Sequence, residues 1–297
     1  MNRLLPVVVF ASLSCTRSTP PPVAKPVPSP ESLKAENAML RVEAGPFQKG
    51  STAQERDRAY EDYLATRGTD TARNRQWFQY EPEQALVTLP GYWFDAHPVT
   101  QAAYGEFIAN HPKVPAPTIN AEDWKAQGFV QPYNTEVARF NWHGRSPARA
   151  RLDHPVVLVS WQHASAYCQW RGSLVGKDRH LPSAEQFEKA ARGPEGSPYP
   201  WGPDFAADRL NSAVQGPRDT TPVTSFPNGR SAVGAYDMAG NVFQWTSTPW
   251  PRGKGRMTVK GSAWDDHGGL GRAASAHGRR ATVRHAIVGF RCAGPLE

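Results

Sequence analysis

Apolar and polar residues alternate at several places along the chain, and each place predicts a short strand. Residues 39–47, with the sequence MLRVEAGPF, alternate with a period of two before a Gly-Pro pair, which is typical of a β-strand. Residues 86–94 predict a second strand that breaks at Pro90 and Gly91. Residues 155–161 form a short, almost continuous apolar run and predict a third strand.

Three helices are predicted from apolar positions spaced three or four apart, and a capping residue is expected at the start of two of them. Thr100 is the expected N-cap of the first helix. The second should run from Gln162 to about Arg171, and the third should start after Ser183, with Gln186 completing a capping box. The expected buried positions are Tyr104, Phe107 and Ile108 in the first helix, Ala166, Tyr167 and Trp170 in the second, and Phe187, Ala190 and Ala191 in the third.

Long parts of the sequence lack a regular period. Residues 112–151 are expected to form a surface excursion, and Gly and Pro interrupt the chain every few residues from Gly193 onward. The sequence contains 25 Gly, 28 Pro and 10 Trp, which is unusual. This composition favours a loop-rich fold with an aromatic core and argues against a helical bundle.

Charge and hydropathy exclude several classes of protein. The 297 residues include 34 Lys and Arg against 27 Asp and Glu, a net charge of +7, but the basic residues are scattered along the chain. A nucleic-acid-binding surface needs clustered positive charge, so we expect no nucleic-acid partner. The mean hydropathy of -0.58 and the lack of an apolar stretch of about 20 residues argue against a polytopic membrane protein.

The first 15 residues have the pattern of an export signal. Arg3 precedes a short apolar core, and small residues then lead to Cys15. This order resembles a bacterial lipoprotein signal, in which the cysteine is lipidated and becomes the first residue of the mature protein. Ser12 stands where such signals usually have leucine, and ordinary signal cleavage nearby is the alternative. In both cases we expect export to the bacterial cell envelope, periplasmic or surface.

The remaining sequence divides into a tether and a domain. Residues 16–37 are rich in Pro and Ser and are expected to stay extended between a lipid anchor and a domain at residues 38–297. Besides Cys15 the chain has Cys168 and Cys292, both in apolar surroundings. In an oxidising compartment a lone pair predicts a disulfide, and two separate buried thiols are the alternative.

Two long motifs identify a family. Residues 154–202 contain HPVVLVSWQHASAYCQWRG and HLPSAEQFEKAARGPEGSPYPWG, and residues 221–247 read TPVTSFPNGRSAVGAYDMAGNVFQWTS. Both resemble central signatures of the formylglycine-generating enzyme family, also called the sulfatase-modifying factor domain, and shorter matches extend the resemblance over residues 39–294. The resemblance implies a single α+β domain of the C-type-lectin-like kind, loop-rich with little regular secondary structure. It also implies a disulfide between Cys168 and Cys292.

The resemblance also implies structural calcium at two places. The expected ligands are Asp237, Gly240, Val242 and Gln244 at the first site, and Asn211, Ser212 and Asp219 at a weaker second site. Carboxylate, amide and carbonyl oxygens are the ligands that Ca²⁺ takes. Gln244 stands where the family usually has Glu, which should weaken the first site. Alternatively, Asp237 and Asn241 only stabilise turns through side-chain hydrogen bonds to the backbone.

The residues expected for catalysis differ from those of the family. Its enzymes oxidise a sulfatase cysteine with oxygen and bind copper(I) through two cysteines, whereas Asp265, Asp266 and residues 270–271 fall about where those cysteines belong here. Oxygen ligands do not replace a bis-thiolate site, so we do not expect copper. Asp265, Asp266, His267 and His277 form a possible site for iron or another redox metal. A polar loop in which Asp caps a turn is the alternative.

The resemblance places the substrate cleft in the same C-terminal region. The residues expected to rim this cleft are Trp245, Trp250, Trp264, Arg272, Arg279 and Arg280. Such a cationic, aromatic rim would suit an extended peptide, a glycan or an anionic ligand. A solvated positive surface is the alternative.

These observations support three functions of different classes. Because the cysteine pair is missing, we favour a membrane-tethered binding or accessory protein whose partner is an envelope protein, a peptide or a glycan. A metal-dependent oxidoreductase that uses the Asp and His residues is the second hypothesis, and a structural envelope component is the third. Residual formylglycine-generating activity is the least expected.

Overall fold

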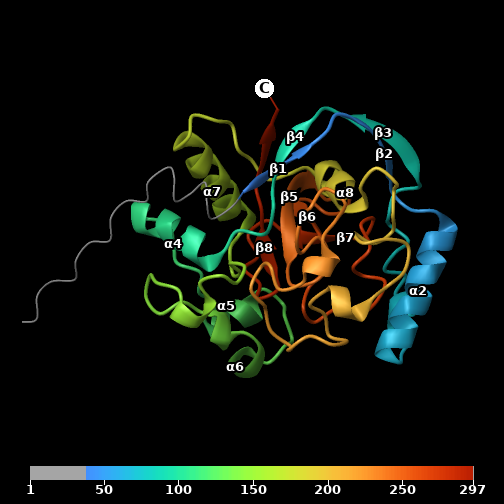
Figure 1. The fold of residues 1–297 in the computed structure, drawn as a ribbon. Helices are drawn as coiled ribbons and strands as arrows, with labels where there is room; N and C mark the ends of the chain where they lie inside the picture. The colour runs from blue at the N-terminus through green and yellow to red at the C-terminus, as the bar shows by residue number, and fades with distance from the viewer. Residues whose placement is uncertain (1–37, 297) are drawn as a thin grey trace, which may run out of the picture.

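The computed structural model describes residues 38–296, so the predicted export signal, Cys15 and the predicted tether lie outside the described residues. A four-stranded sheet lies at the centre of the molecule (Figure 1). Its order is β7-β6-β5-β8, in which β5 and β8 are parallel and the other pairs are antiparallel. The strands are β5 (Phe243–Pro249), β6 (Arg256–Lys260), β7 (Ala276–Arg280) and β8 (Val288–Phe290).

Two smaller antiparallel sheets contain the strands predicted near the start of the domain. One has the order β1-β4-β9 and the other pairs β2 with β3. The predicted strand at 39–47 is two strands, because the chain turns at residues 43–44 and enters the second sheet. The predicted break at Pro90 and Gly91 is confirmed, since it separates β3 from β4. The strands are β1 (Met39–Val42), β2 (Gly45–Lys49), β3 (Ala85–Leu89), β4 (Tyr92–Asp95) and β9 (Ala293–Pro295).

The three predicted helices are confirmed, together with the two predicted caps at Thr100 and Ser183. They are α4 (Gln101–Asn110), α7 (Trp161–Ser173) and α8 (Ala184–Arg192). The Thr100 hydroxyl accepts a hydrogen bond from the backbone N–H of Ala103 at 3.1 Å. Ser183 and Gln186 form the reciprocal capping box at the start of α8. Figure 1 shows α4 and α7 on one side of the central sheet.

Residues 155–161, predicted as a strand, belong to no sheet. The segment is extended but makes single backbone bonds on two sides, from Val156 to the Val99 carbonyl at 2.9 Å and from Leu158 to the His285 carbonyl at 3.1 Å. Leu158 has a positive φ of 61°, which interrupts the regular alternation of a strand. The prediction of a strand here is therefore wrong, although the apolar residues are buried as expected.

Residues 112–151 were expected on the surface, but they contribute to the main core. This segment contains α5 (Ala121–Ala126), α6 (Tyr133–Glu136), η1 (Ala138–Phe140) and η2 (Arg149–Arg151). Trp124, Phe140 and Trp142 are each at most 5% exposed and pack with the central sheet and α4. The short helices change direction every few residues, so their buried positions show no sustained period.

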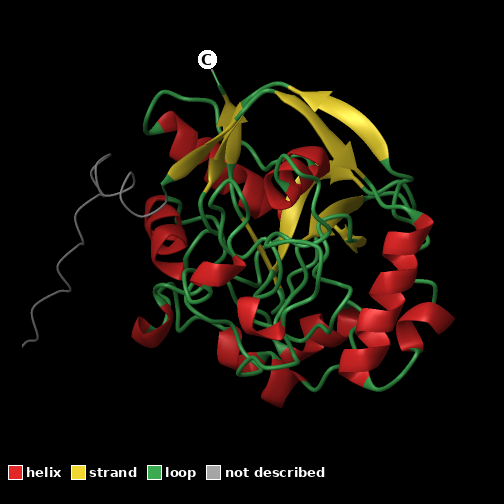
Figure 2. Ribbon diagram, turned by 45° about the vertical axis from the view of Figure 1, so that its right-hand side comes forward, coloured by secondary structure: helices red, strands yellow, loops and turns green. Residues whose placement is uncertain are grey.

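A long helix that the hydrophobic pattern does not predict lies at the opposite edge of the molecule from α4 (Figure 1). It is α2 (Ala53–Arg67), followed by α3 (Thr71–Asn74). Tyr60 and Tyr63 pack in a small cluster with Phe78 and Leu270. This cluster joins the α2–α3 segment to the loop between β6 and β7, which we call the C-terminal loop. Figure 2 shows how much of the interior between these helices and the sheets is formed by loops. No helix within residues 38–296 has the length and apolar character needed to cross a membrane.

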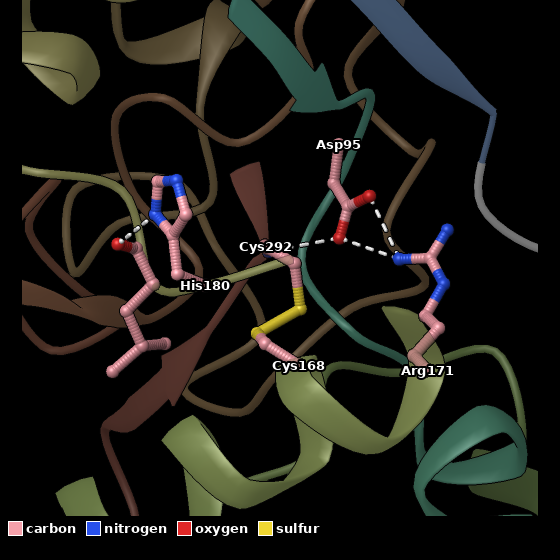
Figure 3. The surroundings of a disulfide bond; sticks show 6 residues. Asp95, Cys168, Arg171, His180 and Cys292 are labelled. Carbon is pink, nitrogen blue, oxygen red and sulfur yellow. Dashed lines mark hydrogen bonds and ion pairs between the residues drawn. A yellow bond between two sulfur atoms is a disulfide. The ribbon is translucent and has the colours of Figure 1, made fainter. Parts of the chain in front are cut away.

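The structure contains the predicted disulfide between Cys168 and Cys292, whose Cα atoms are 5.6 Å apart. Cys168 lies on α7 and Cys292 lies between β8 and β9. Asp95 at the end of β4 accepts a hydrogen bond from the backbone N–H of Cys292 at 2.8 Å and pairs with the Arg171 guanidinium at 2.8 Å (Figure 3). These contacts fasten α7 and the C-terminal residues to the sheet that starts the domain.

Candidate functional site

The loop after β6 carries the residues that stand where the catalytic cysteines were expected. Asp266 closes a turn in this loop, because its Oδ2 accepts a hydrogen bond from the Ala263 N–H at 2.9 Å and its own N–H donates to the Ala263 carbonyl at 3.1 Å. The Asp266 carbonyl also accepts a bond from Ala213 at 2.8 Å. Asp266 is therefore a turn-capping residue, one of the two interpretations that the sequence left open.

Asp265 and Arg279 supply unpaired charged groups beside this turn. Both are partly buried, and neither Asp265 Oδ1 nor Arg279 Nε has a hydrogen-bond partner among residues 38–296. Burial raises the pKa of Asp265, and burial together with the charge of Asp265 raises the pKa of Asp266 well above its ordinary value. The Arg279 guanidinium opposes both increases, while burial lowers its own pKa. Both carboxyls therefore take up a proton more readily than an ordinary exposed aspartate.

The two histidines of the loop region pack against different elements. His277, on β7, contacts Phe243 edge-on with ring centroids 5.3 Å apart, and burial lowers its pKa to about 3, so its ring is neutral. His267 contacts Tyr63 of α2, with centroids 5.9 Å apart. No three His, Cys, Asp or Glu side chains in the described part of the chain are grouped to hold a metal ion. The expected Asp and His site is not assembled, because Asp266 caps its turn and each histidine packs on its own aromatic partner.

An aromatic wall adjoins the carboxyl pair. Trp264 is 3% exposed and stacks on Phe140, with ring centroids 6.0 Å apart and planes 22° apart. The Arg139 guanidinium lies over both rings, 5.0 Å from the centroid of Phe140 and 5.3 Å from that of Trp264. The indole Nε1 of Trp264 has no partner among the described residues. We call Trp264, Asp265, Asp266, His277 and Arg279 the C-terminal polar cluster.

Three residues expected at the rim of a cleft are instead buried. Trp245 is 0% exposed and its Nε1 donates to the Val159 carbonyl at 3.0 Å, because the first four residues of β5 are covered on both faces. Trp264 is the buried wall described above. Arg272 is 2% exposed, and its guanidinium donates to both carboxylate oxygens of Glu81, at 2.6 and 3.1 Å. The expectation of a rim formed by these three side chains is wrong.

The other expected rim residues remain accessible. Trp250 is partly buried and lies on the backbone of Gly278 in β7, where a Cβ atom would be only 2.3 Å from Trp250 Cδ1. Arg280 is exposed and donates to the Gln127 carbonyl. Side chains alternate along a strand, so Arg280 shares the face of β7 that Trp250 covers at Gly278, whereas Arg279 points to the opposite face with His277.

Phe140 and Arg139 are the residues of this site that the sequence did not indicate. Both come from η1, inside the segment that was expected on the surface. A signal was present in the sequence, since Phe140 and Trp142 are large aromatic residues two positions apart in an otherwise polar stretch. Nothing in the local pattern places them against residue 264, which lies on a loop more than a hundred positions later.

The sequence model of the family described as "Sulfatase-modifying factor enzyme 1-like domain" matches residues 24–295. The chain belongs to this family. Among its relatives, the protein named inactive C-alpha-formylglycine-generating enzyme 2 from Mus musculus is 33% identical over 265 residues, covering 76% of this chain and 81% of that protein. The formylglycine-generating enzyme of Mycobacterium tuberculosis is 30% identical over 213 residues, covering 57% of this chain and 69% of that enzyme.

Solved structures agree on the fold. PvdO from Pseudomonas aeruginosa superposes with a TM-score of 0.62 at 21% sequence identity, covering 87% of this chain and 94% of that one. The structure of CarF superposes with a TM-score of 0.59 at 19% identity, covering 88% of this chain and 99% of that one. The domain therefore has the fold of the sulfatase-modifying factor family, a mixed arrangement of helices and sheets.

The family resemblance implies calcium at the turn that contains Gly240, but the first set of ligands does not fit an ion. Gln244 uses both ends of its amide, since its Oε1 accepts from Arg291 Nε at 2.5 Å and its Nε2 donates to the Asp237 carbonyl at 2.7 Å. Asp237 Oδ2 accepts from Asn241 at 2.9 Å, and the Gly240 carbonyl accepts from a backbone N–H at 2.9 Å. The buried Arg291 cation thus holds the Gln244 amide oxygen, and Asp237 Oδ2 and the Gly240 carbonyl already accept bonds from other groups.

The second set of calcium ligands fits only in part. Both carboxylate oxygens of Asp219 accept hydrogen bonds from Arg151, at 2.9 and 2.6 Å, so this carboxylate already has its counter-charge. The Ser212 carbonyl accepts a bond from Gly216 at 2.8 Å. Within the described residues, Asn211 Oδ1 is the side-chain oxygen of the set that lacks a partner. One amide oxygen is far fewer than the six to eight oxygens that Ca²⁺ takes.

Proposed function

We propose that this protein is a non-catalytic member of the sulfatase-modifying factor family that binds a peptide or glycan at the C-terminal polar cluster. We further propose that it acts as an accessory protein of the bacterial cell envelope, held at a membrane by a lipid on Cys15. The relative named inactive C-alpha-formylglycine-generating enzyme 2 supports the coarser part, a non-catalytic protein of this family.

The observation that carries this proposal is the state of the cysteines. Cys168 and Cys292 form a disulfide, and they are the two cysteines of residues 38–296. Copper(I) chemistry of the family type needs a pair of thiolates. Asp265 and Asp266 stand near the expected thiolate positions, where burial pushes both carboxyls toward the protonated form. Leu270, which also falls about where the cysteines were expected, is 3% exposed and packs in the cluster that contains Tyr63.

The unpartnered atoms of the C-terminal polar cluster support a polar, uncharged ligand group. Trp264 Nε1 and Arg279 Nε are donors, Asp265 Oδ1 is an acceptor, and His277 Nε2 is a ring nitrogen without a partner. Leaving such groups unpaired costs about 1–3 kcal/mol each, so a ligand that pairs with them gains affinity. Hydroxyl and amide groups both donate and accept, which matches a glycan or a peptide backbone better than a simple anion.

The first experiment tests the absence of formylglycine chemistry. The full chain is incubated with copper(I), a reductant, oxygen and a peptide that carries the sulfatase cysteine motif, and the peptide is analysed by mass spectrometry. We expect the cysteine to remain unchanged, whereas an active formylglycine-generating enzyme run in parallel converts it. Conversion by this chain at a rate comparable to that control would refute the proposal.

The second experiment tests the binding role on arrays of peptides and glycans. Wild-type protein should give signals that weaken in Asp265→Ala and in Arg279→Gln, because each change removes one of the unpartnered groups. Arg149→Gln is the matched control, since Arg149 is exposed on η2 and lies outside the cluster. Signals that are equal in all four proteins would place binding elsewhere.

The third experiment tests the anchor. Cells that express the full chain are labelled with a clickable fatty-acid analogue and fractionated. We expect label on the wild-type protein and its recovery with membranes, and loss of both in Cys15→Ala. A Cys15→Ala protein that still fractionates with membranes and carries label would contradict lipidation at this residue.

A further inference from the structure

A pocket lined by none of the residues of the C-terminal polar cluster has a chemical character of its own. It is open, has a volume of about 340 Å³, and lies where the C-terminal end of α8 meets η3 (Ala207–Arg209) and η4 (Pro227–Gly229). Arg209, Arg230 and Ser231 are among the residues that line it, with Trp201, Asn228 and Glu195.

A close backbone contact fixes the arrangement of the two arginines. A Cβ atom on Gly229 would lie 1.8 Å from the Arg209 carbonyl oxygen, so glycine is the residue that permits η4 to approach η3 this closely. Arg230 directly follows Gly229, and Arg209 is the last residue of η3. The two guanidinium groups are therefore carried on adjoining backbone segments.

Both arginines have donors that the protein does not use. Within residues 38–296 Arg209 makes no side-chain hydrogen bond or ion pair. Arg230 donates from Nε to the Pro227 carbonyl at 3.0 Å and lies over the Tyr236 ring at 5.3 Å from its centroid, but its two terminal nitrogens have no acceptor among the same residues. Arg192 also lines the pocket, but it is already paired with the buried carboxylate of Glu188 at 3.1 Å.

Ser231 also lines this pocket and carries a buried hydroxyl. The residue is 4% exposed, and its Oγ has no hydrogen-bond partner in the described part of the chain. A buried hydroxyl without a partner costs free energy, which a ligand oxygen would recover. Glu195 is exposed and is the one carboxylate that lines the pocket, so cationic groups outnumber it.

We propose that this pocket binds a tetrahedral oxyanion, a phosphate or sulfate, either free or as a monoester. Two guanidinium forks, the Ser231 hydroxyl and the Asn228 amide offer more donors than the two oxygens of a carboxylate accept, and guanidinium groups match the geometry of phosphate oxygens. The cavity is larger than the anion alone, and its remaining space borders the Trp201 ring, where the organic part of a monoester would lie. This site is independent of ligand binding at the C-terminal polar cluster.

The test is isothermal titration calorimetry of the full chain at low salt with inorganic phosphate, sulfate, glycerol 3-phosphate and acetate. We expect saturable binding of the tetrahedral anions that weakens as salt is added. Arg209→Gln should weaken it by about tenfold or more, the size expected for a hydrogen bond to a charged group. Glu195→Gln should tighten it, because the change removes the negative charge nearest to the anion. Arg149→Gln is the control for net charge, and circular dichroism checks that each variant is folded.

Several outcomes would overturn the assignment. Absence of saturable heat with all three tetrahedral anions would do so, as would equal affinities in Arg209→Gln and Arg149→Gln. Acetate that binds as tightly as phosphate would contradict the tetrahedral geometry. Tighter binding of glycerol 3-phosphate than of phosphate would support the proposal and identify a monoester as the ligand, whereas equal binding would support it with the free anion.

Discussion

The ion pair of Glu81 and Arg272 joins the segment that follows α3 to the C-terminal loop. Its removal should destabilise the whole domain. Both side chains are 2% exposed, and the guanidinium donates to both carboxylate oxygens. Glu81→Gln leaves a buried cation without its counter-charge, a change that typically costs about 3–5 kcal/mol. Domains of ordinary stability have a free energy of unfolding of about 5–15 kcal/mol. We therefore expect Glu81→Gln to remove a large part of the free energy of unfolding.

A double variant separates the loss of the pair from the loss of packing. Replacing Glu81 and Arg272 together with leucine and methionine leaves no unpaired charge, so it should cost less than Glu81→Gln alone. Asp204→Asn is the matched control, because Asp204 forms an ion pair with Arg58 in which the side chains are 72% and 58% exposed. Exposed pairs contribute about 0–1 kcal/mol, so this variant should be close to wild type.

The assay is urea unfolding of the full chain with its disulfide intact, followed by tryptophan fluorescence. A Glu81→Gln variant within about 1 kcal/mol of wild type, or a double variant whose cost is the sum of the single changes, would refute the reasoning. If Arg272→Met instead left stability unchanged and abolished peptide or glycan binding, Arg272 would belong to the cleft after all.

Three further predictions concern other parts of the molecule. Replacing Cys168 and Cys292 with alanine opens a loop of 124 positions, which on the chain-entropy model should lower the free energy of unfolding by about 5 kcal/mol. A loss of less than about 1 kcal/mol, measured by urea unfolding, would contradict this expectation. Burial lowers the pKa of His285 from 6.5 to about 3, so protonation favours the unfolded chain: stability is complete above pH 6.5 and falls by up to about 1.4 kcal/mol per pH unit as the pH drops towards 3. His285→Asn retains an acceptor for the Ile287 N–H and should flatten this decline in unfolding curves between pH 7 and 4, whereas an unchanged slope would assign it to other groups. Adding calcium or EGTA should leave the unfolding midpoint unchanged, and a calcium-dependent rise that Asn211→Ala abolishes would show that the second set of ligands binds an ion.

The parts of the fold that could be predicted are those with local causes. N-caps, the Pro90–Gly91 break and the buried faces of α4 and α8 depend on residues a few positions apart. The helix α2 was missed because Tyr60 and Tyr63 are its large buried residues and the rest of its sequence is polar. Its start was nevertheless readable, since Thr52 and Glu55 form a capping box.

The candidate site was located from the order of motifs, but the neighbours of its residues were not predictable. Asp265 and Asp266 could be placed on a polar loop, and the turn-capping role of Asp266 was one of two interpretations. Glu81 lies 191 positions from Arg272 in the sequence. The residues near Arg272 therefore do not indicate that the Glu81 carboxylate neutralises its charge. For the same reason the sequence suggested that Arg272 binds a ligand, although it is a buried residue with a structural role.

The sheet that contains β1, β4 and β9 has a consequence for how the chain folds. β4 pairs with β1 near the start of the domain and with β9 at its end, and Asp95 bonds a backbone N–H that lies 197 positions away. Contacts of such long range form slowly and only after most of the chain is available. β4 therefore keeps one unpaired edge until β9 has been synthesised. During synthesis this edge is exposed to pairing with other chains, so folding of the domain should depend on protection from aggregation until β9 arrives.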